Sequence, residues 1–567
     1  MSSIDWIVLI VTLTGVIVYG LYKSRTTKDL DGYFLSNRSM PWWIVLLGVM
    51  GTQASAVTFL SVPGQSYVDG MRFVQFYFGL PLAMIVLCVT FVPIFHSLKV
   101  YTAYEYLEKR FDSRTRTFTS FLFLLQRGLS TGISIYAPAI ILSSLLHWNI
   151  YWTNLFMGGL LILYTVSGGA RAVAHTQKFQ LMVVFAGMFM AGYMVVKLMP
   201  EAVGFTDAID LGDKLGKMNV ITTGIKEDGF DWGDRYNLVS GIIAGLFFQL
   251  SYFGTDQSQV GRYLTARSIK ESRMGLIMNG IVKIPMQFLI LLLGVLVFSF
   301  YMFTNHPATF NGRQMDMLNS SQYKQNADAL QLQLDSVQVS KQVVLGQWLN
   351  DKENSQLVAS IKDHLKSEKM IQDSVKALVV KVDPLAETDD TNYIFLRFVI
   401  DYLPKGLVGL LIAVIFLAAW GSIAAALNSL SSTSVVDIHK KFIDKNCTDK
   451  QDYDLSKRYT VGWGLFCIVT AMFATRMGSL IEAVNILGSL FYGVILGIFL
   501  VAFYLKKVGG RSVFWAAVIS ELLTIILFTL NYFNIISLGF LWLVVISSIS
   551  VLVLAWGMEK VRRVGRQ

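Results

Sequence analysis

The chain alternates long apolar stretches with short polar ones. About twenty residues of helix cross the bilayer hydrocarbon, so a hydropathy scan predicts about thirteen spanning segments. They lie at roughly 4–22, 41–62, 73–98, 117–145, 148–166, 178–198, 237–256, 276–303, 397–435, 459–475, 479–504, 513–531 and 536–556. This pattern predicts an all-α polytopic membrane protein of about thirteen transmembrane helices.

The second apolar stretch, from Pro41 to Gly64, is interrupted in its middle by Gly51-Thr52-Gln53-Ala54-Ser55. Backbone freed from helical hydrogen bonding at membrane depth is tolerated only where it lines a cavity or is buried in protein. Secondary transporters use such broken helices near the midplane to bind solutes and ions. Small residues also allow a tight crossing of two unbroken helices. The stretch alone leaves both interpretations open.

Polar and aromatic residues interrupt the seventh segment in the same way, over Phe248–Gln257. Five segments separate the two interruptions, which makes them corresponding members of two five-helix halves. Paired interruptions of this kind indicate an inverted-repeat transporter. The sequence therefore predicts two inverted repeats with broken helices, at 41–198 and 237–504.

Arg127 lies inside the apolar fourth segment. A charge there costs at least ~2.5–3.5 kcal/mol on insertion scales, so it is usually directed toward a pathway or a partner. The pattern leaves open whether Arg127 contacts a solute or a gate, or forms a structural ion pair or snorkels. We include it among the candidate substrate-binding residues.

The ninth segment places Ala418 and Ser422 four residues apart, on one face of a helix. Carbonyl oxygens of Gly51 and Ala54 together with Ser422 would form a small all-oxygen cage suited to a hard cation. A stripe of small residues is also common in plain helix packing.

Composition and charge support the membrane class. Hydrophobic residues make up 54% of the chain and charged residues 15%, far from the balance of a soluble domain. The net charge of +10 does not indicate nucleic-acid binding, because the basic residues gather in alternate loops. These loops lie at 23–38, 99–116, 171–178, 262–274, 440–458, 506–511 and 560–566. The positive-inside rule then predicts an external N-terminus and a cytoplasmic C-terminus.

The polar stretch at about 304–394 carries apolar residues at helical spacing, which favours a helical extracytoplasmic insertion over a solvated linker. These residues are Leu357, Ile361, Leu365, Ile371, Val375 and Leu378. The chain contains no catalytic triad, metal cluster or phosphate loop, so we expect no enzyme activity.

Several motifs resemble those of the sodium/solute symporter family. They are Tyr104-Glu105-Tyr106-Leu107-Glu108 with Arg110-Phe111, Gly168-Gly169, Thr255-Asp256-Gln257 with Arg262-Tyr263-Leu264, Leu403-Pro404 with Gly406-Leu407, Ala426-Leu427-Asn428-Ser429, and Gly488-Ser489-Leu490-Phe491-Tyr492-Gly493. The resemblance covers about residues 30 to 505 in order. The segment Ser55–Pro63 is most similar to the monocarboxylate, vitamin and iodide branch. The resemblance implies the leucine-transporter-type fold and alternating access.

By position, the resemblance implies two sets of site residues. The family's common sodium site maps to Gly51, Ala54, Ala418, Gly421 and Ser422. The substrate site maps to Gln53, Val57, Thr58, Gln249 and Tyr252, with Tyr252 where the family has an inner-gate tyrosine.

Two positions depart from the family pattern. Gly421 stands where relatives have a serine or threonine, which removes a hydroxyl ligand. Gln177 stands where the family has an aspartate linked to a second cation site or to the exit route of the ion. Both departures favour coupling to fewer ions.

We therefore predict a sodium-coupled symporter of a small organic solute, with an organic anion such as a monocarboxylate or vitamin favoured. The alternatives are a sugar or amino-acid symporter of the same family, a proton-coupled or uncoupled facilitator, and a transporter-like sensor. We divide the chain into a first helix and loop at 1–40, repeats at 41–198 and 237–504, an external loop at 199–236, and a C-terminal helix pair with a basic tail at 505–567. The expected partners are the solute, sodium as coupling ion and the lipid of a plasma (inner) membrane. We expect no other cofactor, no nucleic acid and no obligate protein partner.

Overall fold

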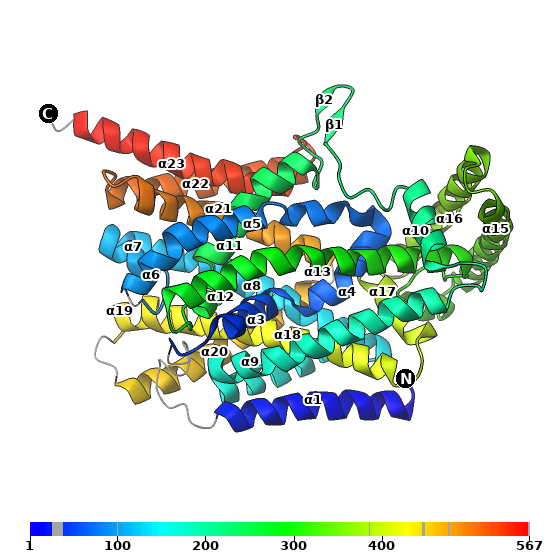
Figure 1. The fold of residues 1–567 in the computed structure, drawn as a ribbon, viewed down its shortest axis with the longest axis horizontal. Helices are drawn as coiled ribbons and strands as arrows, with labels where there is room; N and C mark the ends of the chain where they lie inside the picture. The colour runs from blue at the N-terminus through cyan, green and yellow to red at the C-terminus, as the bar shows by residue number, and fades with distance from the viewer. Residues whose placement is uncertain (25–37, 99, 385, 445–447, 475–476, 565–567) are drawn as a thin grey trace.

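The computed structural model describes residues 1–24, 38–98, 100–384, 386–444, 448–474 and 477–564. Side chains at 20, 21, 23, 24, 167–176, 178 and 449 are outside that description, as are parts of the predicted basic loops at 23–38, 171–178, 440–458 and 560–566. The two termini lie at opposite ends of the helical bundle (Figure 1), as an odd number of membrane crossings requires.

The described chain is nearly all helical. The first half contains α1 (Ser3–Ser24), α3 (Trp42–Gln53), α4 (Ala56–Asp69), η2 (Gly70–Tyr77), α5 (Leu80–Val86), η3 (Leu87–Phe91), α6 (Val92–Leu98), α7 (Glu105–Arg110), α8 (Ser113–Leu146), α9 (Ile150–Lys197) and α10 (Phe205–Lys214). The second half contains η4 (Ser240–Ala244), α11 (Gly245–Thr255), α12 (Gln257–Tyr263), α13 (Ile269–Phe303), α14 (Gly312–Asn319), α15 (Lys324–Asn350), α16 (Ser355–Val382), α17 (Thr391–Tyr402), α18 (Leu407–Thr433), η5 (Ser434–His439), α19 (Lys440–Phe442), α20 (Asp449–Phe473), α21 (Leu480–Tyr504), α22 (Gly510–Tyr532) and α23 (Phe540–Val564). The strands β1 (Ile225–Lys226) and β2 (Gly229–Phe230) form a small antiparallel hairpin.

The predicted all-α class is confirmed, and every predicted spanning segment lies mainly on helix. The predicted count of thirteen spanning helices is not confirmed. In the described residues, eight helical stretches are long and apolar enough to cross a membrane, and three shorter apolar helices accompany them. The segments predicted at 148–166 and 178–198 both lie within α9. The ninth segment was predicted as continuous, which is wrong. Pro404 and Gly406 separate α17 from α18, because neither residue continues a helix well. The φ of Gly406 is +89°.

α18 lies at the centre of the bundle. All of its residues except Leu410 are buried, as expected of a helix that is apolar on every side. Its N-terminus is fixed to α1, because the Asp5 carboxylate accepts hydrogen bonds from the backbone N–H of Gly406 and Gly409, at 2.6 and 3.3 Å. This central helix carries three of the predicted sodium positions.

α4 packs backbone to backbone against two neighbours. A Cβ atom on Gly64 would lie 1.8 Å from the carbonyl oxygen of Thr391 in α17, and one on Gly294 in α13 would lie 2.1 Å from that of Pro63. Glycine is therefore required at both contacts. The stretch from 41 to 64 thus has both features that the sequence left open: it is broken, and it makes tight helix crossings.

The predicted helical insertion is confirmed and consists of α14, α15 and α16. α15 and α16 form a hairpin beyond the ends of the membrane helices (Figure 1). Ile361 and Val375 of α16 are buried, and a fully buried ion pair joins Lys341 of α15 to Glu368 of α16 at 2.7 Å.

Candidate functional site

The first broken helix opens at Ala54 and Ser55, between α3 and α4. The N–H of Ser55 donates to the carbonyl of Gln53 rather than to that of Gly51. Within the described residues, no backbone N–H from the break is directed at the carbonyl oxygens of Gly51 or Ala54. The break therefore leaves free the two carbonyls that the sequence assigned to a cation.

The second broken helix opens at Asp256, between α11 and α12. The Asp256 carboxylate caps α12 by accepting from the N–H and the hydroxyl of Ser258, at 2.8 and 2.6 Å. It also forms an ion pair with Arg127 of α8 and accepts from the Tyr492 hydroxyl at 2.8 Å. Arg127 thus has the structural partner that the sequence left open, and its charge is compensated.

A cavity of about 80 Å³ lies between the two breaks. All six predicted substrate positions line it: Gln53, Val57, Thr58, Arg127, Gln249 and Tyr252. The remaining wall comes from Ser55, Phe76, Tyr77, Phe248, Ile481, Val484, Asn485 and Tyr492. The breaks and α8, η2 and α21 therefore bring the predicted residues together at one place.

Three amide side chains on this wall have buried polar atoms without a hydrogen-bond partner in the described structure. These atoms are Oε1 of Gln53, both amide atoms of Gln249 and Nδ2 of Asn485. Buried polar groups are normally paired, so unpaired amides around a cavity indicate a polar occupant.

Tyr252 lines the cavity and contacts the second broken helix. Its hydroxyl accepts a hydrogen bond of 2.7 Å from Gln259 in α12, and its ring lies 5.5 Å from the Arg127 guanidinium carbon. The predicted gate residue therefore links the cavity to α12.

The predicted sodium positions lie where α3 and α18 meet. The Ser422 hydroxyl donates to the carbonyls of Ala418 and Ala419 at 3.0 and 3.1 Å, which leaves its oxygen lone pairs available. With the free carbonyls of Gly51 and Ala54, this is an oxygen-only donor set of the kind that hard cations prefer.

Two glutamines of α9 fill the space beside this set. A Cβ atom on Gly421 would lie 2.6 Å from Oε1 of Gln180, and one on Gly51 would lie 3.0 Å from the Gln177 side chain. Both amide atoms of Gln177 are buried without a partner among the described residues. The Gln180 amide oxygen therefore lies next to position 421, where the resemblance implies a hydroxyl in relatives, and it adds an oxygen to a donor set of the chemistry that sodium prefers.

Arg262 of α12 lies on the same face of α3 as Gln177, because a Cβ atom on Gly48 would lie 3.6 Å from Gln177 Oε1 and 3.7 Å from Arg262 Cδ. Its Nε donates to the Thr52 hydroxyl at 3.1 Å, and its side chain is almost fully buried. Among the described residues, no carboxylate is within ion-pair distance of this guanidinium. A buried positive charge thus lies beside the predicted cation site.

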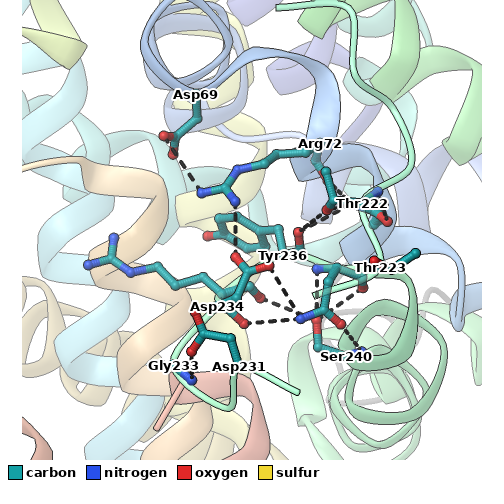
Figure 2. Close-up of polar contacts among 12 residues, drawn as sticks. Asp69, Arg72, Thr222, Thr223, Asp231, Gly233, Asp234, Tyr236 and Ser240 are labelled. Atoms are coloured by element: carbon teal, nitrogen blue, oxygen red, sulfur yellow. Dashed lines mark hydrogen bonds and ion pairs between the residues drawn. The ribbon is translucent and has the colours of Figure 1, made fainter. Parts of the chain in front are cut away.

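A polar network joins the segments beyond the two breaks. Figure 2 shows Arg72 of η2 between Asp69, at the end of α4, and Asp234, in the loop before η4. The Arg72–Asp234 distance is 2.9 Å, so this pair connects η2, which follows α4, to the loop that leads into the second broken helix. Nearby, Lys217 donates to the carbonyl of Val68 at 2.5 Å, and burial lowers the pKa of Lys217 to about 8.

The sequence reasoning missed several of these groups. Asp256 and Tyr492 stand in quoted motifs, but nothing in their local pattern identified Arg127 as their partner. Gln180 lies three residues after Gln177, so the helical period could have placed both on one face. Asn485 and Tyr77 gave no signal.

A helical membrane bundle with two broken helices around one cavity is the architecture of a secondary transporter. The sodium:solute symporter family matches the chain over residues 33–337 and 377–520, and the chain belongs to that family. It is therefore a multi-pass membrane protein and a sodium-coupled symporter of small solutes, not an enzyme.

Individual relatives are distant but extensive. The sodium/sialic acid symporter of Aliivibrio fischeri is 23% identical over 92% of this chain and 86% of its own length. The sodium-dependent multivitamin transporter of Oryctolagus cuniculus is 25% identical over 88% of this chain and 66% of its own. A solved structure of a Na⁺-coupled sialic acid symporter, in a substrate-bound outward-open state, superposes with a TM-score of 0.74 at 22% identity, over 99% of this chain and 98% of the other. This likeness shows that the chain shares the fold of that symporter.

Proposed function

We propose that the chain carries a small organic anion together with one sodium ion, by alternating access through the central cavity. We further propose an external N-terminus, a cytoplasmic C-terminus and a plasma (inner) membrane location, with inverted repeats at 41–198 and 237–504. The observation that carries the proposal is the set of unpaired amides from Gln53, Gln249 and Asn485 around one cavity between the two breaks.

The size of the cavity favours a solute with few non-hydrogen atoms. Its volume of about 80 Å³ is far below the ~300–1,000 Å³ of pockets that hold drug-sized ligands. A short monocarboxylate matches this space better than a vitamin or a sialic acid, either of which would require the walls to move apart.

The charge near the cavity favours an anion. Arg127 is neutralised by Asp256, but Lys283 of α13 is buried and has no acidic partner among the described residues. Its Nζ lies 5.4 Å from the ring centroid of Tyr77, which lines the cavity. Burial without a counter-charge favours the neutral amine, and an anionic solute nearby would favour the ammonium form, so the two would stabilise each other.

The proposed sodium ligands are the carbonyls of Gly51, Ala54 and Ala418, the Ser422 hydroxyl and, beside Gly421, the amide oxygen of Gln180. A bound sodium ion would supply the positive charge that draws the first break and α18 together. Because Gln177 replaces a carboxylate, we propose no second ion.

Energetics distinguish this proposal from transport of a neutral solute. One sodium ion entering across ~100 mV contributes ~2.3 kcal/mol, and a tenfold gradient adds ~1.4 kcal/mol. A neutral solute at one-to-one coupling could use both and accumulate several hundredfold. A monovalent anion moves no net charge, so the voltage contribution vanishes and about tenfold accumulation remains.

The test is uptake into proteoliposomes with a panel of acetate, lactate, pyruvate, biotin, N-acetylneuraminate and glucose. We expect sodium-dependent uptake of a short monocarboxylate that responds little to a potassium–valinomycin potential. Lys283→Gln should raise the KM for that anion, whereas the exposed Lys197→Gln, which removes the same charge at the end of α9, should not.

The compensated charge of Arg127 specifically favours a second candidate, a neutral polar solute such as a sugar, because amides also bind hydroxyl groups. Strong voltage-driven accumulation would establish this alternative, or show that more than one sodium ion travels with the solute.

A further inference from the structure

α13 carries a row of polar side chains, although it is long and apolar enough to cross a membrane. Asn279, Lys283 and Gln287 follow one another at intervals of four residues, so they lie on one side of the helix. All three are buried, with exposed fractions of 0%, 1% and 0%. Polar and charged residues inside a membrane span are expensive and usually functional, so this polar row requires an explanation.

The polar row lacks the partners that burial normally requires. Both amide atoms of Asn279 and both amide atoms of Gln287 have no hydrogen-bond partner in the described structure. The Lys283 ammonium has no acidic partner among the described residues, and the contact it makes is with the ring of Tyr77, whose centroid is 5.4 Å from Nζ. An aromatic ring attracts a cation but does not replace a counter-ion. Three unpaired polar side chains in sequence therefore indicate a missing ligand.

Two close helix contacts show where the polar row lies along the membrane. Gly275 packs against Val45 of α3, and Gly294 packs against Pro63 of α4. The first break is midway between Val45 and Pro63 along the chain, and Lys283 is close to midway between the two glycines. The ammonium-bearing residue of the row therefore lies level with the first break.

The helical phase of α13 shows which space the polar row faces. At ~100° per residue, the row spans ~40° to ~120° from the direction of Gly275. The broken helix lies along that direction at Gly275 and at ~100° from it at Gly294. α5 lies at ~140°, where a Cβ atom on Gly280 would be 3.0 Å from Met84 Cγ. The row therefore faces the space between the first broken helix and the η2–α5 segment.

The polar row adjoins the central cavity at one side chain. Tyr77 of η2 lines the cavity and contacts Lys283, whereas the three residues of the row are not among those that line it. Side chains on a helix lean toward its N-terminus, so Gln287 reaches toward Lys283, and Lys283 reaches toward Asn279. The row is thus a compact polar site beside the cavity rather than part of its wall.

We propose that the polar row binds a small inorganic anion, chloride, through the Lys283 ammonium and the amide N–H groups of Asn279 and Gln287. An ammonium has three N–H donors and no acceptor, so its missing partner must accept hydrogen bonds. Because burial disfavours an uncompensated charge, an anion stabilises the ammonium form more than a water molecule does. Each amide can also donate to the anion with its nitrogen and accept from the ammonium with its oxygen.

This proposal does not rest on the identity of the transported solute. An anionic solute in the cavity is a second source of negative charge for Lys283. Chloride supplies the counter-charge while no such solute is bound. The two sources are distinguished by measuring anion binding to the purified protein without sodium and without a transported solute.

The test compares melting temperatures in N-methylglucamine chloride and N-methylglucamine methanesulfonate at equal ionic strength. We expect a saturable rise of the wild-type melting temperature with chloride. Lys283→Met keeps the apolar stem and removes the charge, so it should raise the half-saturating chloride concentration at least about tenfold. Gln287→Leu keeps the volume and removes one donor, so it should raise that concentration several-fold.

Arg262→Gln is the matched control for the location of the anion. Arg262 is also a buried cation without a carboxylate partner among the described residues, but its Nε is bound to the Thr52 hydroxyl. This variant should keep the wild-type response to chloride. A response that survives in Lys283→Met, or that disappears in Arg262→Gln, would place the anion elsewhere and overturn the proposal.

Two further outcomes would also overturn the chloride site. One is a wild-type melting temperature that is equal in the two salts. The other is a rise with N-methylglucamine acetate but not with chloride, which would assign Lys283 to the carboxylate of the solute and leave the proposed function standing. Failure of sodium-dependent anion uptake would leave this site untouched, because its test contains no sodium.

Discussion

The two broken helices each carry or contact a buried arginine, and the two arginines are in opposite electrostatic situations. Arg127 contacts the second break through an ion pair with Asp256 and a 2.9 Å hydrogen bond to the Tyr492 hydroxyl. Arg262 contacts the first break through Thr52 and has no carboxylate partner in the described chain. The arginine at the second break is thus neutralised by a carboxylate, and the arginine at the first break is not.

The difference indicates different roles for the two charges. A paired charge holds α8, α12 and α21 together and contributes little net field. An unpaired charge near a cation site opposes ion binding, by ~2 kcal/mol for two unit charges ~8 Å apart at an effective dielectric constant of ~20. We infer that Arg262 weakens sodium binding enough for the ion to be released.

The largest expected effect on stability comes from breaking the ion pair between Arg127 and Asp256. Asp256→Asn leaves Arg127 buried without its counter-charge, which typically costs ~3–5 kcal/mol. Thermal unfolding of the purified protein should show a large loss of stability. Asp231→Asn, which breaks the exposed Lys226–Asp231 pair, should cost under ~1 kcal/mol. The double variant Arg127→Met/Asp256→Leu should recover much of the loss; if it does not, the pair is more than an electrostatic unit.

Removing the hydroxyl of Ser422 should weaken sodium binding strongly. A hydrogen bond or ligand contact to a charged group contributes ~1.5–3 kcal/mol, so Ser422→Ala should raise the sodium concentration for half-maximal uptake at least about tenfold. Ser432→Ala, further along the same helix, is the matched control, because its hydroxyl bonds only to the Ser429 carbonyl. An unchanged sodium dependence in Ser422→Ala would place the ion elsewhere.

Neutralising the unpaired arginine, Arg262, should strengthen sodium binding, whereas Ser422→Ala weakens it. Arg262→Gln removes a repulsive charge and keeps a donor for Thr52, so sodium should bind several-fold more tightly, by up to ~2 kcal/mol. The measurement is the sodium concentration that gives half of the maximal rise in melting temperature, with the exposed Arg267→Gln as control. Equal sodium affinity in wild type and variant would remove Arg262 from the account of ion release.

The smallest effect on transport is expected from substitutions of Tyr252. Tyr252→Phe loses only the hydrogen bond from Gln259, ~0.5–1.5 kcal/mol, and should reduce transport moderately. Tyr252→Ala also loses the ring that lines the cavity, and should impair transport more. Should all three proteins transport equally, Tyr252 is not a gate.

The sequence predicted the positions of the breaks better than their partners. Small and polar residues at 51–55 and 248–257 interrupt apolar helices, and that signal is local. The ion pair between Arg127 and Asp256 joins residues 129 positions apart, and no periodicity relates them. The break between α17 and α18 was missed although Pro404 and Gly406 mark it, because hydropathy averages across a few residues.

In the candidate site, too, the sequence predicted the positions of residues better than their partners. All six substrate positions line one cavity; the resemblance supplied five of them, and Arg127 came from its place in an apolar segment, but their roles remain predictions. Gln180 was not anticipated, because the loss of a hydroxyl at Gly421 can be compensated from another helix, and only three-dimensional packing reveals which one.

The close packing of Gly64 and Gly294 has a consequence for the bilayer. Without side chains at these contacts, α4 cannot tilt alone, so opening the outer side must move α13 and α17 with it. α13 presents Ile281 and Leu289 to lipid, 57% and 64% exposed. Each cycle therefore displaces annular lipid, and we expect turnover to vary with acyl-chain length through hydrophobic mismatch.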